Sequence, residues 1–405
     1  MSSLGYTTYG VHWQNKTTAL CFVGGLLIGT VAGCRMLLKV KVTGISGILS
    51  RAVDWTVNPG LDQKFLSIIF VFGLIAGGGI ASIYIPDAFE DWTTLPLGRL
   101  APAGLILGIG VRMGSGCTSG HGICGISSYR LRSLCATSTF MLTGFITAMS
   151  ANTSSYLPPF QNTLPYGPSL AIAFVGIASC ILMTMIGMRF RDVFLDNETY
   201  GDRFHTVSDF IFGINFALAM AVSNMTKLSA TISFLDLRYW NPALAFVMIA
   251  GILITSIVYL FSFRRGSPVL STKFDISTLA SVDVKLILGA ALFGVGWGLA
   301  GACPAPMLTN MAQATYPCIY FVFVVLGIWC QLYVIDPLWV RYITRNQTTD
   351  SSNTMTSDNR LYNETLLKPG SDRSKRSPLS YIAPADVQLY DNYNEGNGSY
   401  ESSGL

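Results

Sequence analysis

The densest run of reactive side chains lies in a glycine-rich segment at residues 114–128, which reads GSGCTSGHGICGISS. It places Cys117, His121 and Cys124 within eight residues of one another. Thiols, an imidazole, hydroxyls and glycine backbone occur together there. Three kinds of site therefore have to be weighed: a metal site, a thiol-based catalytic site and an anion-binding turn.

The metal and thiol interpretations each lack a component. A structural zinc site needs four ligands, usually in two close pairs, and no fourth ligand at a matching spacing accompanies the three candidates. The other histidines, His12 and His205, lie at the boundaries of apolar segments. The segment contains no Cys-x-x-Cys pair and no acid that could orient the histidine for nucleophilic chemistry. We therefore expect no metal and no catalytic residue.

The anion-binding interpretation uses every residue type in the segment. Glycines let the backbone direct its N–H groups toward a ligand, and the N-terminus of a following helix adds positive partial charge. Hydroxyls donate hydrogen bonds, and a neutral thiol is a weak donor with a polarizable sulfur. This chemistry favours a small, soft, sulfur-containing anion, and the candidate binding residues are Gly116, Cys117, Thr118, Ser119, Gly120, His121 and Cys124.

The composition indicates a membrane protein. The 405 residues have a mean hydropathy of +0.47 and only 12% charged residues, about half of the roughly 25% typical of globular chains. The net charge of +4 is small and the basic residues are scattered, so nucleic-acid binding has no support. Nine cysteines in a long apolar chain do not suggest a secreted disulfide framework.

The predicted fold class is an all-α polytopic membrane protein with about nine transmembrane helices. A spanning helix needs about 20 mostly apolar residues. The expected spans are 18–38, 65–85, 99–114, 135–151, 167–188, 206–223, 242–263, 284–300 and 317–338. Several are short or rich in glycine, and eight or ten spans is the alternative. Residues 341–405 are polar, so we expect a disordered tail.

The basic residues predict how these spans are oriented. With nine spans, fifteen lysines and arginines fall on the side of the C-terminus and four on the other side. Loops rich in Lys and Arg stay in the cytoplasm. We therefore expect an integral protein of the plasma membrane with residues 1–17 outside and the tail inside the cell.

The sequence also contains an internal repeat. Residues 41–49 (KVTGISGIL) resemble 227–235 (KLSATISFL), and 108–120 resemble 294–306, both at an offset of 186 residues. That offset aligns Cys117 with Cys303. The predicted transport domain, 18–340, therefore consists of repeat one (about 18–151), a connector helix (167–188) and repeat two (about 206–338).

Each repeat holds four spans and the connector adds one crossing, so the second repeat must be inverted. Inverted repeats usually place a site near the middle of the bilayer. The segments 41–53 and 115–134, with their partners 224–241 and 301–316, are too short to span. We expect re-entrant loops from both faces, forming an hourglass whose neck brings Cys117 and Cys303 together.

These motifs resemble the YeeE/YedE family of sulfur transporters, whose characterised members take up thiosulfate. The resemblance covers residues 18–340 and is carried by GCTSGHGICGIS (116–127), GACPAP (301–306), GISGIL (44–49) and the repeat that joins them. It implies a membrane-embedded hourglass in which cysteine thiols pass thiosulfate through the neck by S–H contacts. The Pro304-Ala-Pro306 run departs from the family pattern.

The resemblance also assigns residues. Cys117 and Cys303 match the cysteines of the two half-loops. The family uses a cysteine in its first span as well, for which Cys34 and Cys21 are the candidates, and Cys34 is included in the predicted site. His121 and Cys124 either touch the substrate or orient the loop.

The expected function is therefore the uptake of thiosulfate or a closely similar anion by a membrane transporter that is not an enzyme. The expected partners are this anion and the lipid bilayer, with no nucleic acid and no cofactor. A soluble sulfur-handling partner stays open. The alternative is a membrane-bound thiol or persulfide protein that transfers sulfur.

Overall fold

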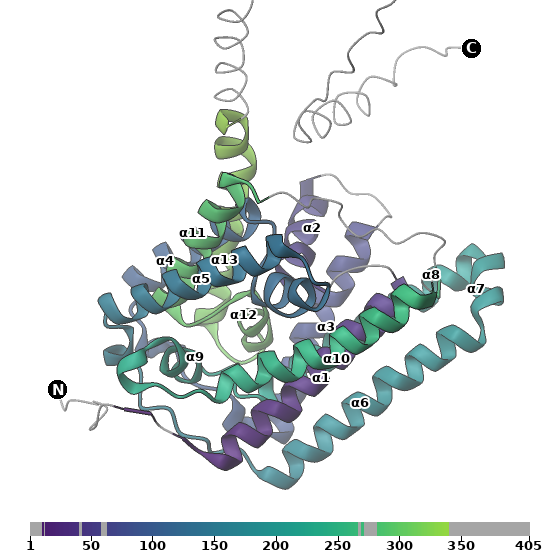
Figure 1. Ribbon diagram of the computed structural model, residues 1–405, viewed down its shortest axis with the longest axis horizontal. Coiled ribbons are helices and arrows are strands. Elements are labelled where there is room, and N and C mark those ends of the chain that lie inside the picture. Colours follow the sequence, from purple (N-terminus) through teal and green to yellow (C-terminus); the bar gives the residue numbers. More distant parts are fainter. Residues whose placement is uncertain are drawn as a thin grey trace, which may run out of the picture. The chain divides into compact units, whose positions relative to one another are not determined.

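A computed structural model of the chain describes residues 10–11, 13–39, 43–57, 63–265, 269–270 and 282–339. Within these ranges every regular element is helical (Figure 1), so the predicted all-α fold is confirmed. The expected tail, 341–405, and most of the N-terminal segment, 1–17, lie outside the described residues.

Two sets of helices differ in length. The long helices are α1 (Asn15–Lys39), α3 (Gln63–Tyr84), α4 (Leu97–Met113), α5 (Leu131–Ser150), α6 (Tyr166–Arg189), α8 (Glu198–Val222), α10 (Ala243–Arg265), α11 (Val284–Ala300) and α13 (Thr315–Cys330). The shorter helices are α2 (Ile45–Val57), η3 (Thr118–Gly125), α7 (Arg191–Asp196), α9 (Leu228–Leu235) and α12 (Pro304–Asn310).

The long helices coincide with the nine predicted spans. Eight stretches of the described chain are long and apolar enough to cross a membrane. The ninth, α4, has 17 residues and qualifies only together with the preceding turns Pro86–Thr94, from which it is bent by 108°. The predicted polytopic membrane protein is therefore confirmed, with eight or nine spans.

The long helices pack in two groups that the short helices connect. The first group contains α1, α3, α6, α8 and α10, and the second contains α4, α5, α11 and α13 (Figure 1). Four short helices each contact both groups: α2 touches α3 and α4, η3 touches α10 and α5, α9 touches α10 and α5, and α12 touches α3 and α13. The four helices thus lie where the two groups meet.

The contacts follow the 186-residue offset. It maps α1 onto α8, α3 onto α10, α4 onto α11 and α5 onto α13. The contact between α3 and α8 therefore has an equivalent in the contact between α10 and α1, and both contacts are extensive. Gly108 and its equivalent Gly294 make matching contacts. A Cβ atom on Gly108 would lie 2.1 Å from the Val324 carbonyl oxygen of α13, and one on Gly294 would lie 2.5 Å from the Phe140 carbonyl oxygen of α5.

Small residues allow this close packing. Helix association in lipid relies on close backbone approach rather than on hydrophobic burial. On α1, a Cβ atom at Gly25 would lie 2.5 Å from the Val247 carbonyl oxygen, and one at Gly29 would lie 2.8 Å from that of Gly251. The GxxxG spacing of α1 therefore sets its distance from α10.

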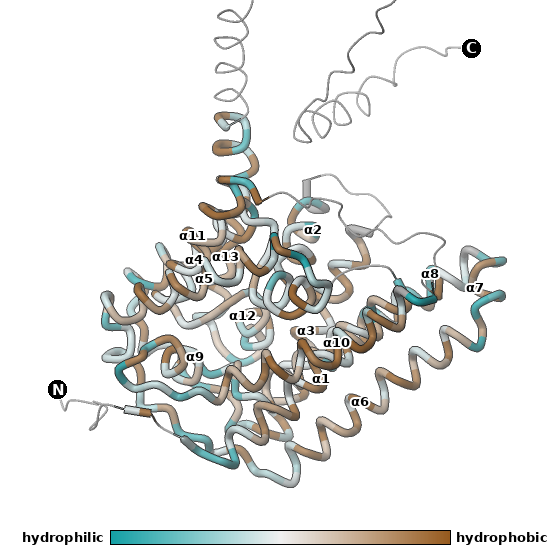
Figure 2. Tube along the Cα trace, in the orientation of Figure 1, coloured by the Kyte–Doolittle hydropathy of each residue, from teal (hydrophilic) through white to brown (hydrophobic). Residues whose placement is uncertain are grey.

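The outer helices expose apolar side chains. α6 is hydrophobic along most of its length and becomes hydrophilic toward α7 (Figure 2). Its exposed large side chains include Phe174, Val175, Ile181, Leu182 and Met185. An apolar surface of this kind suits contact with lipid chains.

A buried ion cluster joins α1 to α8. The Arg35 Nε atom lies 2.8 Å from Asp209 Oδ1, and Lys39 Nζ lies 2.9 Å from Asp209 Oδ2. All three side chains are almost fully buried. Removing one partner of a buried ion pair typically costs about 3–5 kcal/mol, so this cluster constrains how α1 and α8 pack.

The contact between α3 and α12 gives a first prediction. A Cβ atom on Gly78 would lie 1.9 Å from the Thr309 carbonyl oxygen, whereas one on the adjacent Gly79 would meet only the Ala312 Cβ atom at 3.7 Å. We expect Gly78→Ala to destabilise the fold by about 1–3 kcal/mol, because overpacking forces the backbones apart. Gly79→Ala should be nearly neutral. Thermal unfolding of the purified proteins in detergent measures both, and equal midpoints would contradict this packing.

Candidate functional site

Cys117 and Cys303 occupy the same position in two short helices. Cys117 is the residue before η3 and Cys303 the residue before α12, and both have extended backbone conformations. Pro304 follows Cys303 as the first helical residue, a position that needs no N–H donor. Both thiols are buried. Each thiol thus stands at the positive end of a short helix.

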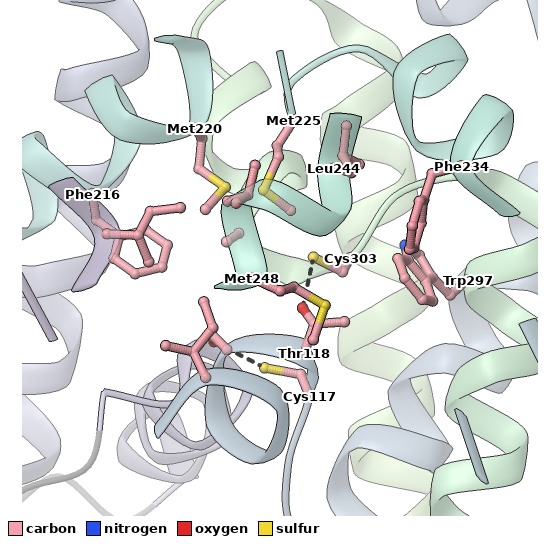
Figure 3. A pocket seen from close by; sticks show the side chains of 15 residues that line it. Cys117, Thr118, Phe216, Met220, Met225, Phe234, Leu244, Met248, Trp297 and Cys303 are labelled. Atoms are coloured by element: carbon pink, nitrogen blue, oxygen red, sulfur yellow. Dashed lines mark hydrogen bonds between the residues drawn. The ribbon is translucent and has the colours of Figure 1, made fainter. Parts of the chain in front are cut away.

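The two thiols line one cavity (Figure 3). Its volume is about 30 Å³, which is room for about one or two water molecules. Both halves of the chain form its wall, through α1 and η3 on one side and α8 to α12 on the other. The polar and sulfur-containing lining residues are Cys117, Thr118, Ser119, Met220, Met225, Met248 and Cys303.

The rest of the lining is apolar. It includes Ile28 of α1, Phe216 of α8, Phe234 of α9 and Trp297 of α11. No charged side chain lines the cavity within the described part of the chain. The cavity therefore presents sulfur atoms and hydroxyls in an otherwise hydrocarbon surface.

Hydrogen bonds connect the thiols across the two repeats. Thr118 Oγ1 donates to the Cys303 sulfur at 3.8 Å (Figure 3). The Cys117 sulfur lies 3.2 Å from Ser119 Oγ, which also accepts a hydrogen bond of 3.2 Å from the backbone N–H of Ile45, the first residue of α2. The Cys117 loop is thus bonded to α2 on one side and to the Cys303 loop on the other.

His121 lies outside the cavity lining and holds the loop in place. Its Nε2 atom is 3.0 Å from the Gly114 carbonyl oxygen, and its Nδ1 atom is 3.2 Å from Ser133 Oγ on α5. The ring covers Gly116, where a Cβ atom would lie 2.1 Å from the imidazole Cδ2 atom. Of the two roles that the sequence allowed for His121, this geometry fits a positioning residue.

Two predicted residues lie away from the cavity. The Cys124 sulfur donates to the Thr43 carbonyl oxygen at 3.7 Å, at the start of α2. The Cys34 thiol lies beside Thr184 of α6. The structure therefore does not bring Cys34 together with Cys117 and Cys303.

The other first-span candidate lies on a different face of α1. Cys21 donates to the Ser223 carbonyl oxygen at 3.2 Å, at the end of α8. It precedes the cavity residue Ile28 by seven residues, which is two helical turns, so both lie on one face of α1. Of the two cysteines, Cys21 is the one on the cavity side of the helix.

Sequence reasoning missed several residues around the thiols. Met220 and Met248 lie in apolar spans, and Met225 lies in the segment 224–241. Nothing in the sequence pattern distinguishes the three from packing residues. The buried Tyr320 hydroxyl donates to the Ala302 carbonyl oxygen at 3.2 Å and so fixes the backbone beside Cys303. Only three-dimensional proximity identifies these four residues.

Two further observations define the loops. Gly301 ends α11 with a φ of +73°, a left-handed conformation that favours glycine, and it turns the chain toward Cys303. Within the described ranges, no three His, Cys, Asp or Glu side chains come together in a way that could hold a metal ion.

The Cys117 loop gives a second prediction. Gly116→Ala should displace the His121 ring and break its two hydrogen bonds, each worth about 1 kcal/mol. Gly120→Ala is the matched control, because its Cβ atom would lie an ordinary 3.5 Å from the Gly44 Cα atom. We expect a lower unfolding temperature for Gly116→Ala alone. A normal midpoint for that variant would show that the ring does not cover Gly116.

Comparisons with known proteins divide the chain into two parts. Residues 6–147 match the Sulphur transport family, and residues 204–338 match a family of unknown function (DUF6691). The first match contains α1 to most of α5, and the second contains most of α8 through α13. The two matched regions thus correspond closely to the two repeats.

Several bacterial relatives resemble part of the chain. A probable transporter of Xylella fastidiosa is 41% identical over 129 residues, which are 31% of this chain and 89% of the relative. A probable transporter from another strain of that species is 40% identical over 129 residues, with the same coverage. A further probable transporter of the species is 30% identical over 112 residues, which are 27% of this chain and 77% of that relative. The chain therefore belongs to the YeeE/YedE family of sulphur transport proteins, and it is a membrane transporter rather than an enzyme.

Proposed function

We propose that the protein takes up thiosulfate, or a closely similar sulfur-containing anion, through a neck at Cys117 and Cys303. One observation carries this proposal: two thiols at equivalent positions of the two repeats line one cavity inside the helix bundle. A transporter needs such a site between its two halves, because each half can then open toward one face.

The donors at the neck suit a sulfur anion. Thr118 gives its hydroxyl proton to the Cys303 sulfur, so the S–H group of Cys303 is free to donate to a ligand. The Cys117 thiol and the Ser119 hydroxyl are hydrogen-bonded to each other, so this pair adds one more proton that can be donated to a ligand. Thioether and thiol sulfurs are soft and polarizable, which favours contact with the terminal sulfur of thiosulfate over an oxyanion made of oxygen alone.

Passage requires the cavity to widen. A volume of about 30 Å³ is too small for a polyatomic anion. Met220, Met225 and Met248 form part of the wall, and the three rotatable bonds of each methionine let it move aside. The four short helices connect two helix groups, so a small displacement between the groups also opens the neck.

The predicted orientation supplies a direction. With the N-terminus outside, the segment that carries α9 faces the exterior and the segment that carries α2 faces the cytoplasm. The excess of basic residues on the α2 side supports this orientation. Uptake then runs from the methionine-lined cavity toward α2.

The geometry favours passage over sulfur transfer. A thiol must lose its proton to attack a sulfane sulfur, and apolar burial opposes that loss. The described lining contains no basic group that could accept the proton. The thiols therefore act as neutral hydrogen-bond donors.

The third prediction tests this role. In proteoliposomes that contain the purified protein, Cys117→Ala and Cys303→Ala should each lower the uptake of ³⁵S-thiosulfate by about tenfold to hundredfold. The reason is that a hydrogen bond to a charged group is worth about 1.5–3 kcal/mol. Cys34→Ala and Cys135→Ala are matched controls and should retain uptake, because neither thiol lines the cavity.

Folding and chemistry must be checked in the same samples. Each variant should elute as a single species in size-exclusion chromatography, and excess sulfate should not compete with thiosulfate at the neck. Full uptake by both cysteine variants would exclude the proposed neck. A stable sulfur adduct on Cys117, detected as a mass increase after exposure to thiosulfate, would favour the sulfur-transfer alternative.

A further inference from the structure

We infer that a second anion-binding subsite lies beside the neck, at the start of α2, where Arg35, Thr43 and Ser46 bind the oxygen atoms of the anion after the thiols release it. We name these three residues the α2 subsite. The inference rests on the transport function proposed above.

The position of Arg35 links this subsite to the cavity. Arg35 follows the cavity residue Ile28 by seven residues, so it lies on the same face of α1 and about 10 Å further along the helix. Cys21, Ile28 and Arg35 thus form one line along α1, in which the cavity occupies the middle. A ligand that leaves the cavity along this line reaches the guanidinium group.

Arg35 has hydrogen-bonding capacity to spare. The residue is 2% exposed, and its Nε atom is bonded to Asp209, which also pairs with Lys39. This cluster contains two cations and one carboxylate. The Arg35 Nη1 atom is buried and has no hydrogen-bond partner within the described residues. The guanidinium group also stacks over the Phe70 ring, 4.7 Å from its centroid, so Nη1 is the atom left to donate to a ligand. An ionisable side chain inside a span points to function.

The start of α2 carries two further buried groups without partners. Thr43 and Ser46 are 0% and 1% exposed, and neither hydroxyl oxygen has a hydrogen-bond partner in the described part of the chain. Both lie at the positive end of a helix of 13 residues. Since buried hydroxyls are normally bonded, these two groups can both donate to a ligand at the start of α2.

Contacts with η3 bring these groups to the neck. The Cys124 sulfur is 3.7 Å from the Thr43 carbonyl oxygen, and Arg35 lies close enough to Cys124 for its charge to act on the thiol. Ser119 Oγ accepts from the Ile45 N–H group and contacts the Cys117 sulfur. The start of α2 is therefore bonded to η3, with Ser119 linking Ile45 to Cys117, and Arg35 lies within electrostatic range of Cys124.

The repeat supplies an internal comparison. The equivalent helix of the second repeat, α9, has a carboxylate at its start: Glu90 Oε2 accepts a hydrogen bond of 2.9 Å from the backbone N–H of Ser229. Ser229 is the repeat equivalent of Thr43. Among the described residues, no carboxylate is bonded to the first turn of α2. The start of α9 thus binds a carboxylate of the protein itself. The start of α2 has N–H and hydroxyl donors but no bonded carboxylate among the described residues.

The chemistry of the α2 subsite differs from that of the neck. A guanidinium group, two hydroxyls and a helix N-terminus recognise negative charge and oxygen acceptors, and none of them distinguishes a soft sulfur atom. The α2 subsite should therefore bind small divalent oxyanions in general, sulfate included. The neck selects the sulfur anion, and the α2 subsite attracts it out of the apolar cavity.

The experiment removes the neck and asks whether binding remains. Equilibrium dialysis with ³⁵S-thiosulfate is carried out on the full-length Cys117→Ala/Cys303→Ala protein in detergent. We expect one thiosulfate to bind and sulfate to displace it. Adding Thr43→Val and Ser46→Ala should weaken this binding by about tenfold or more, since two hydrogen bonds to a charged ligand are lost.

A matched control removes the same two kinds of hydroxyl group at positions away from the α2 subsite. Thr137→Val with Ser262→Ala removes a buried threonine and a buried serine whose hydroxyls also lack partners in the described structure, on α5 and α10. In the cysteine-free background this pair should leave thiosulfate affinity unchanged. Arg35→Lys is the second test: it retains the ion pair with Asp209 but removes the spare guanidinium donor, so the affinity should again fall.

The outcomes separate the two proposals. Binding by the wild type that disappears in Cys117→Ala/Cys303→Ala would overturn the α2 subsite and leave the transport function standing. Unchanged affinity after Thr43→Val/Ser46→Ala, in protein that elutes as a single species, would also overturn it. Absence of both binding and uptake in the wild type would overturn the proposed function itself.

Discussion

Four short helices begin inside an apolar bundle, and the unsatisfied N–H groups at their starts are the constraint on which the site depends. Hydrocarbon offers no acceptor to such groups. Glu90 serves the start of α9, and Ser119 serves the first N–H group of α2. Cys117 and Cys303 stand at the starts of η3 and α12. The starts of η3 and α12 thus meet at one cavity between the two helix groups, and the start of α2 is bonded to η3 beside it.

The fold repeats, but the chemistry of its two halves does not. Cys117 and Cys303 are equivalent, and so are Gly108 and Gly294. Arg35, by contrast, is replaced by Ala221 at the 186-residue offset, and Asp209 corresponds to Val23. Packing residues shared by the two repeats can form a neck. Release of an anion toward one side needs charged groups that are present at one end of the neck and absent at the other. The shared small residues therefore belong to the framework, whereas the asymmetric charges both fix α1 against α8 and fit the proposed directional release.

Sequence periodicity predicted the framework well because its signals are local. Nine apolar segments, glycines at helix contacts and the 186-residue offset are all visible in one dimension, and they led to the all-α fold and to the pairing of Cys117 with Cys303. The sequence does not show which neighbouring helix each side chain of a helix contacts. Cys34 and Cys21 are both cysteines in one apolar helix, and only the positions of α6 and α8 decide which neighbours they meet. The cavity methionines were missed for the same reason.

In the proposed pathway, the buried cluster of Arg35, Asp209 and Lys39 makes the two ends differ. A divalent anion in an apolar neck is unstable unless donors replace its hydration shell. Thiols and hydroxyls replace part of that hydration shell, and they bind the anion weakly enough for it to leave the neck. A guanidinium group held by one shared carboxylate keeps part of its charge for a ligand, at a helix start that already favours anions. In the proposed pathway, weak neutral donors in the neck are followed by a stronger charged site at one end, and the second repeat has Ala221 where the first has Arg35.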